Sequence, residues 1–504
     1  MRELSDRHSG TLNGRLVIPP VGRSVSVAVR LEADTAADIA VQHTAWMLVS
    51  LLVRLVGVVD EVRVGGANAL LHRRVIPFAT QAGDLRASLV EAASLISGAP
   101  VLVGHALSSS TILTVGPGEA SGALRVYGEG FTGAISRQAI QSVSDSPLPF
   151  GPYIAACLAA GEVFREIRFP AELWIPTTSV SFSAWDYAIA PGSLSAAGSA
   201  FQQVELDIGL AGVGAVGSAV MHALWACPGL SGRALVADAD PDGIDLTNLN
   251  RCVTFHQSHV GRPKASTAAE ILDDADVIWT PIDGKYARGL ISPMPEVLLS
   301  AVDTNRSRED LQQGLWPARL LGASTKDLRA EVLRCGPPGV GPCLRCFNPP
   351  EVDLPDDVVR ERLRAMADLE LAALAREINQ PIQLVRRWAR EGGCSEVGDA
   401  AVTAIRSRNQ QPAMFSVGFV SVLAGTLLAA EALKEHLGRV TPLSDAMQSS
   451  KFQFWRPSKA GNGRPLPVQR DPLCPACAPA AGGVETWRDR ADRWRPGAHD
   501  RGAR

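Results

Sequence analysis

The sequence lacks any large excess of charge of one sign. Its 49 Lys and Arg residues nearly balance 52 Asp and Glu residues, which leaves a formal net charge of −3. A chain this close to neutral has no global field that favours nucleic acid or an anionic membrane, so we expect neither as a partner. The sequence also lacks an apolar segment near its start, where MRELSDRHSG is polar. We therefore expect no secretory signal and a cytoplasmic location.

Long apolar runs are also scarce. The main one, FSVGFVSVLAGTLLAAEALK at residues 415–434, has nearly the length of a membrane span. It is rich in small residues, and Glu431 and Lys434 stand at its end. These features fit a buried core helix better than a span.

Histidine patterns for metal binding are missing, because the nine histidines form no H-x-x-x-H or H-E-x-x-H motif. Nine cysteines in a large chain without an export signal indicate metal binding or thiol chemistry rather than a disulfide framework. Two C-x-x-C pairs, Cys343 with Cys346 and Cys474 with Cys477, suit a tetrahedral zinc site. The alternative is two independent redox motifs.

The other cysteines have different surroundings. Cys157, Cys227 and Cys252 resemble small buried apolar residues, and Cys335 lies eight residues before the first C-x-x-C pair. Cys394 lies in REGGCSEVGDAA, which predicts a mobile loop after a charged helical segment. Arg386, Arg387 and Arg390 are near it in sequence and would favour a reactive thiolate if they turn toward it.

At 504 residues the chain is too long for one core, so we expect two or three domains. Strand-like alternation at 23–33, a helical pattern at 37–56 and a strand pattern at 60–66 predict a βαβ unit with a parallel sheet. The predicted organisation is an α/β domain at 1–175, a linker at 176–203, a second α/β unit at 204–350, a helical insertion at 351–392, a cysteine-loop, core-helix and zinc-closing segment at 393–480, and a flexible tail at 481–504.

A glycine-rich turn marks a nucleotide site. GLAGVGAVGSAVMHAL, residues 209–224, follows an apolar strand pattern and opens an apolar helix pattern. It holds Gly212, Gly214 and Gly217 in a G-x-G-x-x-G motif that suits phosphate at a helix N-terminus. Asp238 ends the next predicted strand, about twenty residues on, where a ribose-binding carboxylate is expected. These features alone fit an NAD oxidoreductase.

The segments that follow do not fit hydride transfer. Asn248 and Arg251 stand in a predicted loop, and Lys264 stands near a predicted helix start. Cations that converge near phosphates suit phosphoryl or adenylyl transfer, because charge develops on the phosphorus oxygens. Asp303 ends a predicted strand, and a carboxylate at that edge of a parallel sheet suits Mg²⁺ on a triphosphate.

In order and spacing these motifs resemble the ThiF/MoeB/ubiquitin-activating superfamily, which adenylates the C-terminal glycine of ubiquitin-like or sulfur-carrier proteins. The resemblance covers residues 205–350 and 393–477, and Arg308 also falls where the family carries an arginine. Ala215 in the glycine loop and Cys252 after the arginine depart from the family pattern, but neither removes a charged group. The five matching motifs are the glycine loop, Asp238–Asp240, Asn248–Arg251, Gly261–Lys264 and Asp303.

The resemblance implies a Rossmann-like adenylation fold with ATP, Mg²⁺ and Zn²⁺ as cofactors. Asp238, with Asp240 at the same acidic strand end, would hold the ribose. Asn248, Arg251 and Lys264 would contact the phosphates, and Asp303 would bind magnesium. The resemblance also accounts for the wide separation of the two cysteine pairs, which together would hold a structural zinc ion.

The N-terminal half resembles a degenerate second copy of the same fold, so the resemblance implies two tandem copies. Active members of the family pair two such domains, and one lends an arginine to the ATP of the other. Arg137, in GEGFTGAISRQ, is the candidate for this role, and a surface arginine is the alternative.

The main hypothesis is an ATP-dependent activating enzyme that adenylates a ubiquitin-like protein and then forms a thioester with it on Cys394. Related enzymes carry a cysteine at the matching place. Sulfur-carrier adenylation and a non-catalytic nucleotide-binding scaffold are the rivals. High Arg, Ala and Gly contents indicate a GC-rich bacterial genome, where such two-lobed enzymes resemble those of ubiquitination-like antiviral operons. The implied partners are the ubiquitin-like protein, a conjugating-enzyme-like protein and a second copy in a homodimer.

Overall fold

The computed structural model describes most of the chain as two compact units, one formed by residues 1–349 and 415–504 and the other by residues 350–414. The described residues are 10–12, 16–18, 22–96, 98–108, 110–200, 203–238, 243–284, 286, 295–315, 317–348, 356–392, 397–402, 416–438 and 443–494.

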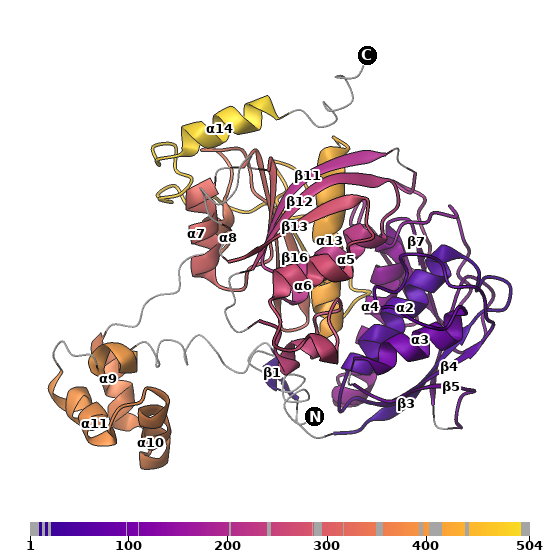
Figure 1. The fold of residues 1–504 in the computed structure, drawn as a ribbon, viewed down its shortest axis with the longest axis horizontal. Helices are drawn as coiled ribbons and strands as arrows, with labels where there is room; N and C mark the ends of the chain where they lie inside the picture. Colours follow the sequence, from indigo (N-terminus) through magenta and orange to yellow (C-terminus); the bar gives the residue numbers. More distant parts are fainter. Residues whose placement is uncertain are drawn as a thin grey trace. The chain divides into compact units, whose positions relative to one another are not determined.

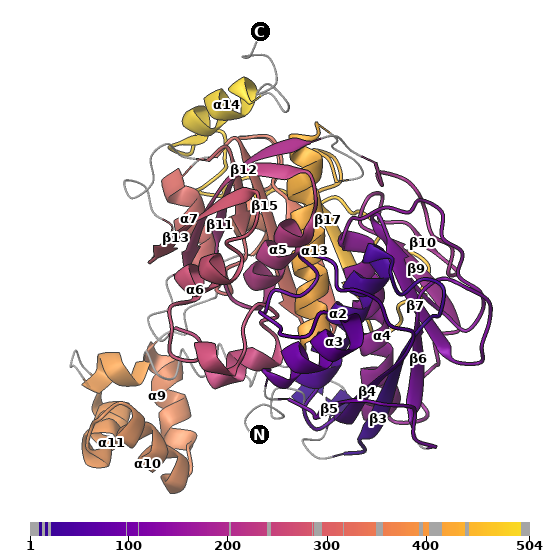
Figure 2. The ribbon, with the colours of Figure 1, turned by 45° about the vertical axis from the view of Figure 1, so that its right-hand side comes forward.

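The N-terminal half of the first unit forms an eight-stranded sheet with the order β10-β9-β8-β7-β6-β3-β4-β5 (Figures 1 and 2). The strands from β5 to β7 are parallel, and β8, β9 and β10 continue the sheet antiparallel. A separate hairpin pairs Gly10–Leu12 (β1) with Leu16–Ile18 (β2). The strands of the sheet are Val25–Leu31 (β3), Val59–Gly66 (β4), Val101–Val103 (β5), Thr111–Val115 (β6), Leu124–Glu129 (β7), Thr132–Ser136 (β8), Ser179–Ser183 (β9) and Ile189–Ala190 (β10).

The C-terminal half forms a seven-stranded sheet with the order β13-β12-β11-β14-β15-β16-β17. The strands from β13 to β15 are parallel, and β16 and β17 are antiparallel additions. These strands are Val204–Ala211 (β11), Leu230–Asp238 (β12), Val277–Asp283 (β13), Val297–Ser300 (β14), Arg319–Lys326 (β15), Arg329–Arg334 (β16) and Ser449–Gln453 (β17).

The two sheets have the same topology. In chain order, β3 to β9 of the first sheet take the places that β11 to β17 take in the second, with the same parallel and antiparallel neighbours. The helices correspond as well, because α2, α3 and α4 follow the same strands as α5, α6 and α13. The expected two tandem copies of a Rossmann-like fold are therefore confirmed. These helices are Ile39–Arg54 (α2), Leu85–Ser94 (α3), Phe150–Arg168 (α4), Ala215–Ala226 (α5), Lys264–Ile271 (α6) and Gly418–His436 (α13).

Helices α4 and α13 join the two copies. Every residue of α13 is buried, and α13 packs on both α4 and α5. Gly161 and Gly425 allow this close approach, since a side chain at Gly161 would meet Phe454 and one at Gly425 would meet Ala219. The helix is thus the core helix expected from the sequence. No helix in the described residues combines the length and hydrophobicity needed to cross a bilayer.

A buried ionic contact fixes the segment that was expected to be a linker. Residues 176–203 contain β9 and β10 rather than a free connection, because β9 pairs with β8 along its whole length. The Tyr187 hydroxyl donates to Glu431 at 2.7 Å, and the Lys434 ammonium donates to the carbonyl of Ala184 at 2.9 Å. The two charged residues near the end of α13 therefore hold the first copy against the second.

Helices and cysteines cover the opposite face of the second sheet. Here α7 (Asn305–Leu315), α8 (Leu344–Phe347) and α14 (Val484–Arg493) accompany a cluster that includes Leu298, Leu320, Cys343 and Trp487. The tail at 481–504 was expected to be flexible, yet α14 forms within it, because Val484 and Trp487 are buried and Arg490 pairs with Glu296 at 3.0 Å.

Two histidines lie at matching places in the two copies. His43 is on α2 and His222 is on α5, and the Tyr153 ring lies between them, with centroid distances of 6.0 and 5.3 Å. Both imidazoles are completely buried, and neither ring nitrogen of His43 has a hydrogen-bond partner within the described residues. Burial lowers the pKa of each histidine to about 3.

These histidines should make the fold sensitive to acid. The unfolded chain takes up their protons near pH 6.5, whereas the folded chain does so only near pH 3. Their contribution is therefore complete above pH 6.5 and falls as the pH drops, by about 2 kcal/mol per histidine at pH 5. Urea unfolding at pH 7.5 and pH 5.0 should show this loss. The His43→Leu/His222→Leu variant should lose less stability between the two pH values, whereas replacement of the exposed His105 should leave the loss unchanged.

The second unit is a small helical body with its own core. It contains Asp356–Ala365 (α9), Asp368–Glu377 (α10), Ile382–Glu391 (α11) and helical backbone at 397–402. Its core residues include Val359, Leu363, Leu374, Val385 and Trp388. The expected helical insertion is therefore present.

Candidate functional site

The glycine turn connects β11 to α5 at the carboxyl edge of the second sheet. Gly212 has a φ of +92°, and a Cβ there would lie within 3 Å of the Ala301 carbonyl group. A Cβ on Gly217 would overlap the carbonyl oxygen of Gly212, so the helix can approach the turn only without a side chain. Space is open above Gly214, where no atom lies within 4 Å of an added Cβ. The turn thus leaves room for a phosphate at the N-terminus of α5.

Asp238 ends β12 beside this turn. Its Oδ2 accepts a hydrogen bond of 2.5 Å from the backbone nitrogen of Val213, which lies within the glycine turn. This contact holds the carboxylate at the strand end, the position at which a Rossmann-like fold binds ribose hydroxyls. Asp240 lies outside the described residues.

The predicted phosphate-binding segment begins with the short helix η1 (Leu246–Asn250). Asp245 caps this helix, and Asn248 completes a capping box, because its Oδ1 accepts from the backbone nitrogen of Asp245 at 3.1 Å. Arg251 follows directly, and its guanidinium donates to the Thr247 carbonyl and to Asn250 Oδ1, each at 2.8 Å. The amide nitrogen of the buried Asn250 has no hydrogen-bond partner in the part of the chain that the structure describes. Asn250 lies within the motif Asn248–Arg251, but its burial and unpaired amide nitrogen follow from the fold and have no signal in the sequence.

Lys264 is the first residue of α6 and is 8% exposed. The residues before Lys264 pair with Ile244, which lies just before η1. The Ile244 nitrogen donates to the Arg262 carbonyl at 2.9 Å, and the Gly261 nitrogen donates to the Ile244 carbonyl at 2.8 Å. The two motifs are therefore neighbours in the fold.

The buried thiol of Cys252 shows how closely the charged residues gather. Burial raises the pKa of this thiol. The positive charges of Arg251, Lys264 and Arg54 oppose that rise, and the carboxylate of Asp238 adds to it. Three cations and the carboxylate of Asp238 therefore all act electrostatically on this one thiol.

Asp303 lies just beyond β14 and is exposed. The preceding residues Ala301 and Val302 contact the Gly212 turn, so this carboxylate stands at the same sheet edge as the glycine loop. Arg308 is on α7 and donates to Asn305 Oδ1 at 2.8 Å and to Asn348 Oδ1 at 3.2 Å. An exposed carboxylate next to a phosphate loop fits a hard cation such as Mg²⁺.

The first copy contributes one buried arginine to this site. Arg54, on the last turn of α2, is 1% exposed, and burial lowers its pKa to about 10. Its guanidinium donates to the Leu249 carbonyl and to the carbonyls of Val253 and Phe255, the latter two at 3.3 and 3.0 Å. Arg54 therefore clamps the segment that carries Arg251. The sequence gives no sign of this contact, because it joins residues about 200 positions apart.

Replacing Arg54 with leucine should loosen the phosphate-binding segment. The loss leaves three carbonyls without their charged donor, which should cost about 3 kcal/mol of unfolding free energy. ATP–pyrophosphate exchange should show a KM for ATP raised by at least about tenfold, since Arg251 is the expected phosphate contact and its misplacement should weaken that contact. Arg165→Leu is a matched control, because Arg165 is equally buried on α4 and donates to the Ile175 carbonyl at 2.5 Å. It should lower stability but leave the KM unchanged. An unchanged KM in Arg54→Leu would contradict the clamp.

Arg137, the arginine expected to serve the second copy, lies elsewhere in the first copy. It follows β8, is exposed, and lines a cavity of about 400 Å³ together with Arg30, Glu162 and Glu166. Its charge acts to lower the pKa of Glu166, which burial raises.

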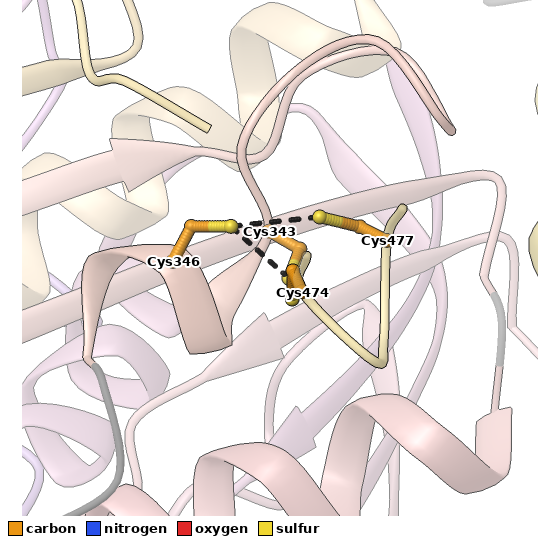
Figure 3. A group of neighbouring side chains, drawn as sticks. All are labelled: Cys343, Cys346, Cys474 and Cys477. Carbon is orange, nitrogen blue, oxygen red and sulfur yellow. Dashed lines mark hydrogen bonds between the residues drawn. The ribbon is translucent and has the colours of Figure 1, made fainter. Parts of the chain in front are cut away.

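The four cysteines of the two C-x-x-C pairs form one cluster (Figure 3). All four sulfur atoms lie within 4.8 Å of one another, and neighbouring sulfurs are 3.5 to 3.9 Å apart. A tetrahedron of sulfurs 2.3 Å from a central ion has edges of about 3.8 Å. The cluster therefore fits a closed, four-coordinate metal site. It fastens the segment before α14 to the start of α8.

The remaining described cysteines are unsuited to nucleophilic chemistry. Cys157, Cys227, Cys252 and Cys335 are buried, and burial raises the pKa of each thiol. Cys394 lies outside the described residues.

Comparison with known proteins places this site in a family. The ThiF family model matches residues 197–476, more than half of the chain. The uncharacterized protein y4jF of Sinorhizobium fredii (strain NBRC 101917 / NGR234) is 25% identical over 367 residues, which cover 65% of this chain and 67% of that protein. Two structures of E. coli MccB, with MccA-N7isoASN and with ATP, are 18% and 16% identical, at TM-scores of 0.34 and 0.33, over 54% of this chain and 67% of theirs. From the match to the family model, this chain belongs to the ThiF family.

Proposed function

We propose that this chain is an ATP-dependent activating enzyme that adenylates the C-terminal glycine of a ubiquitin-like protein and then carries it as a thioester on Cys394. The observation that carries the first step is the contact of Asp238 with the glycine turn, together with the backbone pairing that makes the Arg251 and Lys264 motifs neighbours. Membership of the ThiF family supports adenylation as the reaction class.

In the proposed first step, a carboxylate oxygen of the substrate attacks the α-phosphorus of ATP. An acyl-adenylate forms, the bond to the β-phosphate oxygen breaks, and pyrophosphate leaves with the electron pair. Arg251 and Lys264 would stabilise the charge that develops on the phosphate oxygens. Asp238 would orient the ribose, and Asp303 would hold the Mg²⁺ ion that neutralises the triphosphate.

In the proposed second step, the Cys394 thiolate attacks the acyl carbon and AMP leaves. Two observations support this choice of cysteine. Four of the eight other cysteines belong to the metal-binding cluster, and burial raises the pKa of the remaining four. A nucleophilic thiol needs exposure and a lowered pKa, which none of these four has.

The second observation concerns where the segment around Cys394 leaves and rejoins the first unit. Before the insertion, Asn348 accepts a hydrogen bond from Arg308, which lies five residues after Asp303. On the other side, Gly418 packs against Asn250 and the Cα of Arg251. The residues of the first unit that precede and follow the insertion in sequence thus contact two of the matched motifs, which supports a role for its cysteine in the same reaction.

The thioester step can be tested with Cys394→Ala. This variant should keep ATP–pyrophosphate exchange and lose the thiol-sensitive covalent adduct with the ubiquitin-like protein. Cys335→Ala is the matched control and should keep both. An adduct of wild-type yield in Cys394→Ala would contradict the assignment. Exchange without an adduct in the wild type would mean that the enzyme stops at the adenylate, as a sulfur-carrier adenylyltransferase does.

A further inference from the structure

The second unit contains two helices in a helix-turn-helix arrangement. Helix α10 ends at Glu377 and α11 begins at Ile382, so four residues connect them, a length typical of this motif. Figures 1 and 2 show α9, α10 and α11 gathered in one bundle.

The turn between α10 and α11 has a defined geometry. Asn379 has a φ of +51°, and its nitrogen donates to the Arg376 carbonyl at 3.1 Å. The Gln380 nitrogen donates to the Ala375 carbonyl at 2.9 Å, which completes a Schellman motif at the end of α10. Pro381 then starts α11 at once, because its fixed φ suits the residue at a helix start. The chain therefore reverses within four residues in a single conformation.

Apolar residues of both helices are buried in one core. Leu374 and Ala375 of α10 are buried, and so are Val385 and Trp388 of α11. With these residues inward, α11 presents the opposite face to solvent, where Gln383, Leu384, Arg387 and Arg390 are exposed and Arg386 is partly exposed.

The exposed face of α11 carries three arginines. Arg386, Arg387 and Arg390 lie within two turns, and the only acidic residue of the helix is Glu391. Arg386 pairs with Asp368 at 2.5 Å and Arg387 pairs with Glu391 at 2.9 Å, but in both pairs the side chains are 40 to 88% exposed. Such exposed ion pairs contribute little to the free energy of folding. A phosphate group could therefore replace the carboxylate as the partner of the arginine with little loss of stability.

We propose that the second unit binds duplex DNA, with α11 in the major groove. The arginines would contact phosphates, and Gln383, near the start of α11, would contact base edges. The first helix of such a pair lies across the DNA backbone, where α10 places Arg376 on an exposed position. The whole-chain charge gives no indication of this, because acidic residues of the same unit, among them Asp368 and Glu391, balance these arginines.

Duplex DNA is favoured over other occupants by shape. A single α-helix fits the major groove of B-form DNA, whereas the major groove of A-form RNA is too deep and narrow to admit one. A basic exposed helix on a rigid turn therefore suits DNA better than double-stranded RNA. Docking of an acidic protein on the same arginines is the competing outcome of the test.

Fluorescence anisotropy with the full-length protein and a labelled 30-base-pair duplex of mixed sequence tests the proposal. At low salt we expect binding in the micromolar range or tighter. The Arg386→Gln/Arg387→Gln/Arg390→Gln variant should bind at least about tenfold more weakly. The slope of log affinity against log salt should become shallower by about 2 to 3, because up to three phosphate contacts are lost. Circular dichroism should confirm that the helices remain.

The matched control removes three exposed cations from the first unit, as Arg456→Gln/Lys459→Gln/Arg464→Gln. It should bind DNA like the wild type. Three results would each overturn the proposal. They are an equal loss of DNA affinity in both triple variants, an equal affinity of the wild type for an RNA duplex of the same sequence, and no DNA binding by the wild type at 50 mM salt. Wild-type DNA binding by the α11 variant, together with loss of carrier-protein binding, would assign the surface to a protein instead.

Discussion

The Asp303→Ala variant should lose ATP–pyrophosphate exchange by about two to three orders of magnitude, with its fold intact. The magnitude follows from the several kcal/mol by which a bound divalent ion stabilises charge in phosphoryl chemistry. Asp303 stands at the sheet edge formed by the glycine turn and residues 301–302, and it is exposed, so its removal leaves no gap in the core. Thermal unfolding should therefore match the wild type.

The control for this variant is Asp310→Ala. Asp310 is also exposed and lies on the following helix, α7, so it tests the loss of a nearby negative charge. Exchange should be normal in this variant. Raising the Mg²⁺ concentration should restore part of the activity of Asp303→Ala, because weaker coordination is then compensated by mass action. Wild-type exchange in Asp303→Ala would remove this residue from the proposed site.

Removal of the metal from the four-cysteine cluster should have the largest effect on stability. We expect wild-type protein purified without chelator to contain one zinc ion per chain. Chelation, or Cys474→Ser, should lower Tm by about 10 °C, because a structural zinc ion contributes directly to folding. The cluster fastens Cys474 and Cys477 to the start of α8, and Trp487 packs in the same core. Its loss should release this segment from the sheet while exchange at lower temperature continues.

Cys335→Ala provides the comparison. Cys335 is buried in the same apolar cluster but is not one of the four clustered cysteines. This variant should keep its zinc and lose only the small stability expected for one buried sulfur atom. Metal analysis that finds no zinc in the wild type would contradict the zinc assignment.

The sequence predicted those parts of the fold that local pattern determines. The glycine turn, the strand before it and the apolar helix at 418–436 are marked by periodicity and by residue type. The two C-x-x-C pairs have a spacing that only a few kinds of site require. That the two pairs form one site, although Cys343 and Cys474 are 131 positions apart, is predicted by the family resemblance and not by the spacing.

Other parts depend on contacts that local pattern does not encode. Ser, Ala, Pro and Gly at 176–203 favour a linker, yet β9 forms because β8 offers it an unpaired edge. Arg54 stands at the end of an apolar helix, where nothing distinguishes a surface arginine from one that reaches carbonyls of the other copy. The arginines of α11 are marked in the sequence only by their closeness to Cys394, since their exposure follows from the packing of Val385 and Trp388 on the other face of the helix.

Joining the two copies in one chain has a consequence for how the site assembles. The Arg54 clamp and the contact between α4 and α13 are made within a single polypeptide, whereas two separate chains would have to meet before they could form. The effective concentration of one copy around the other is therefore fixed by the covalent connection. Dilution should therefore not separate Arg54 from the segment that carries Arg251. The specific activity should stay constant at protein concentrations at which a pair of separate chains would dissociate.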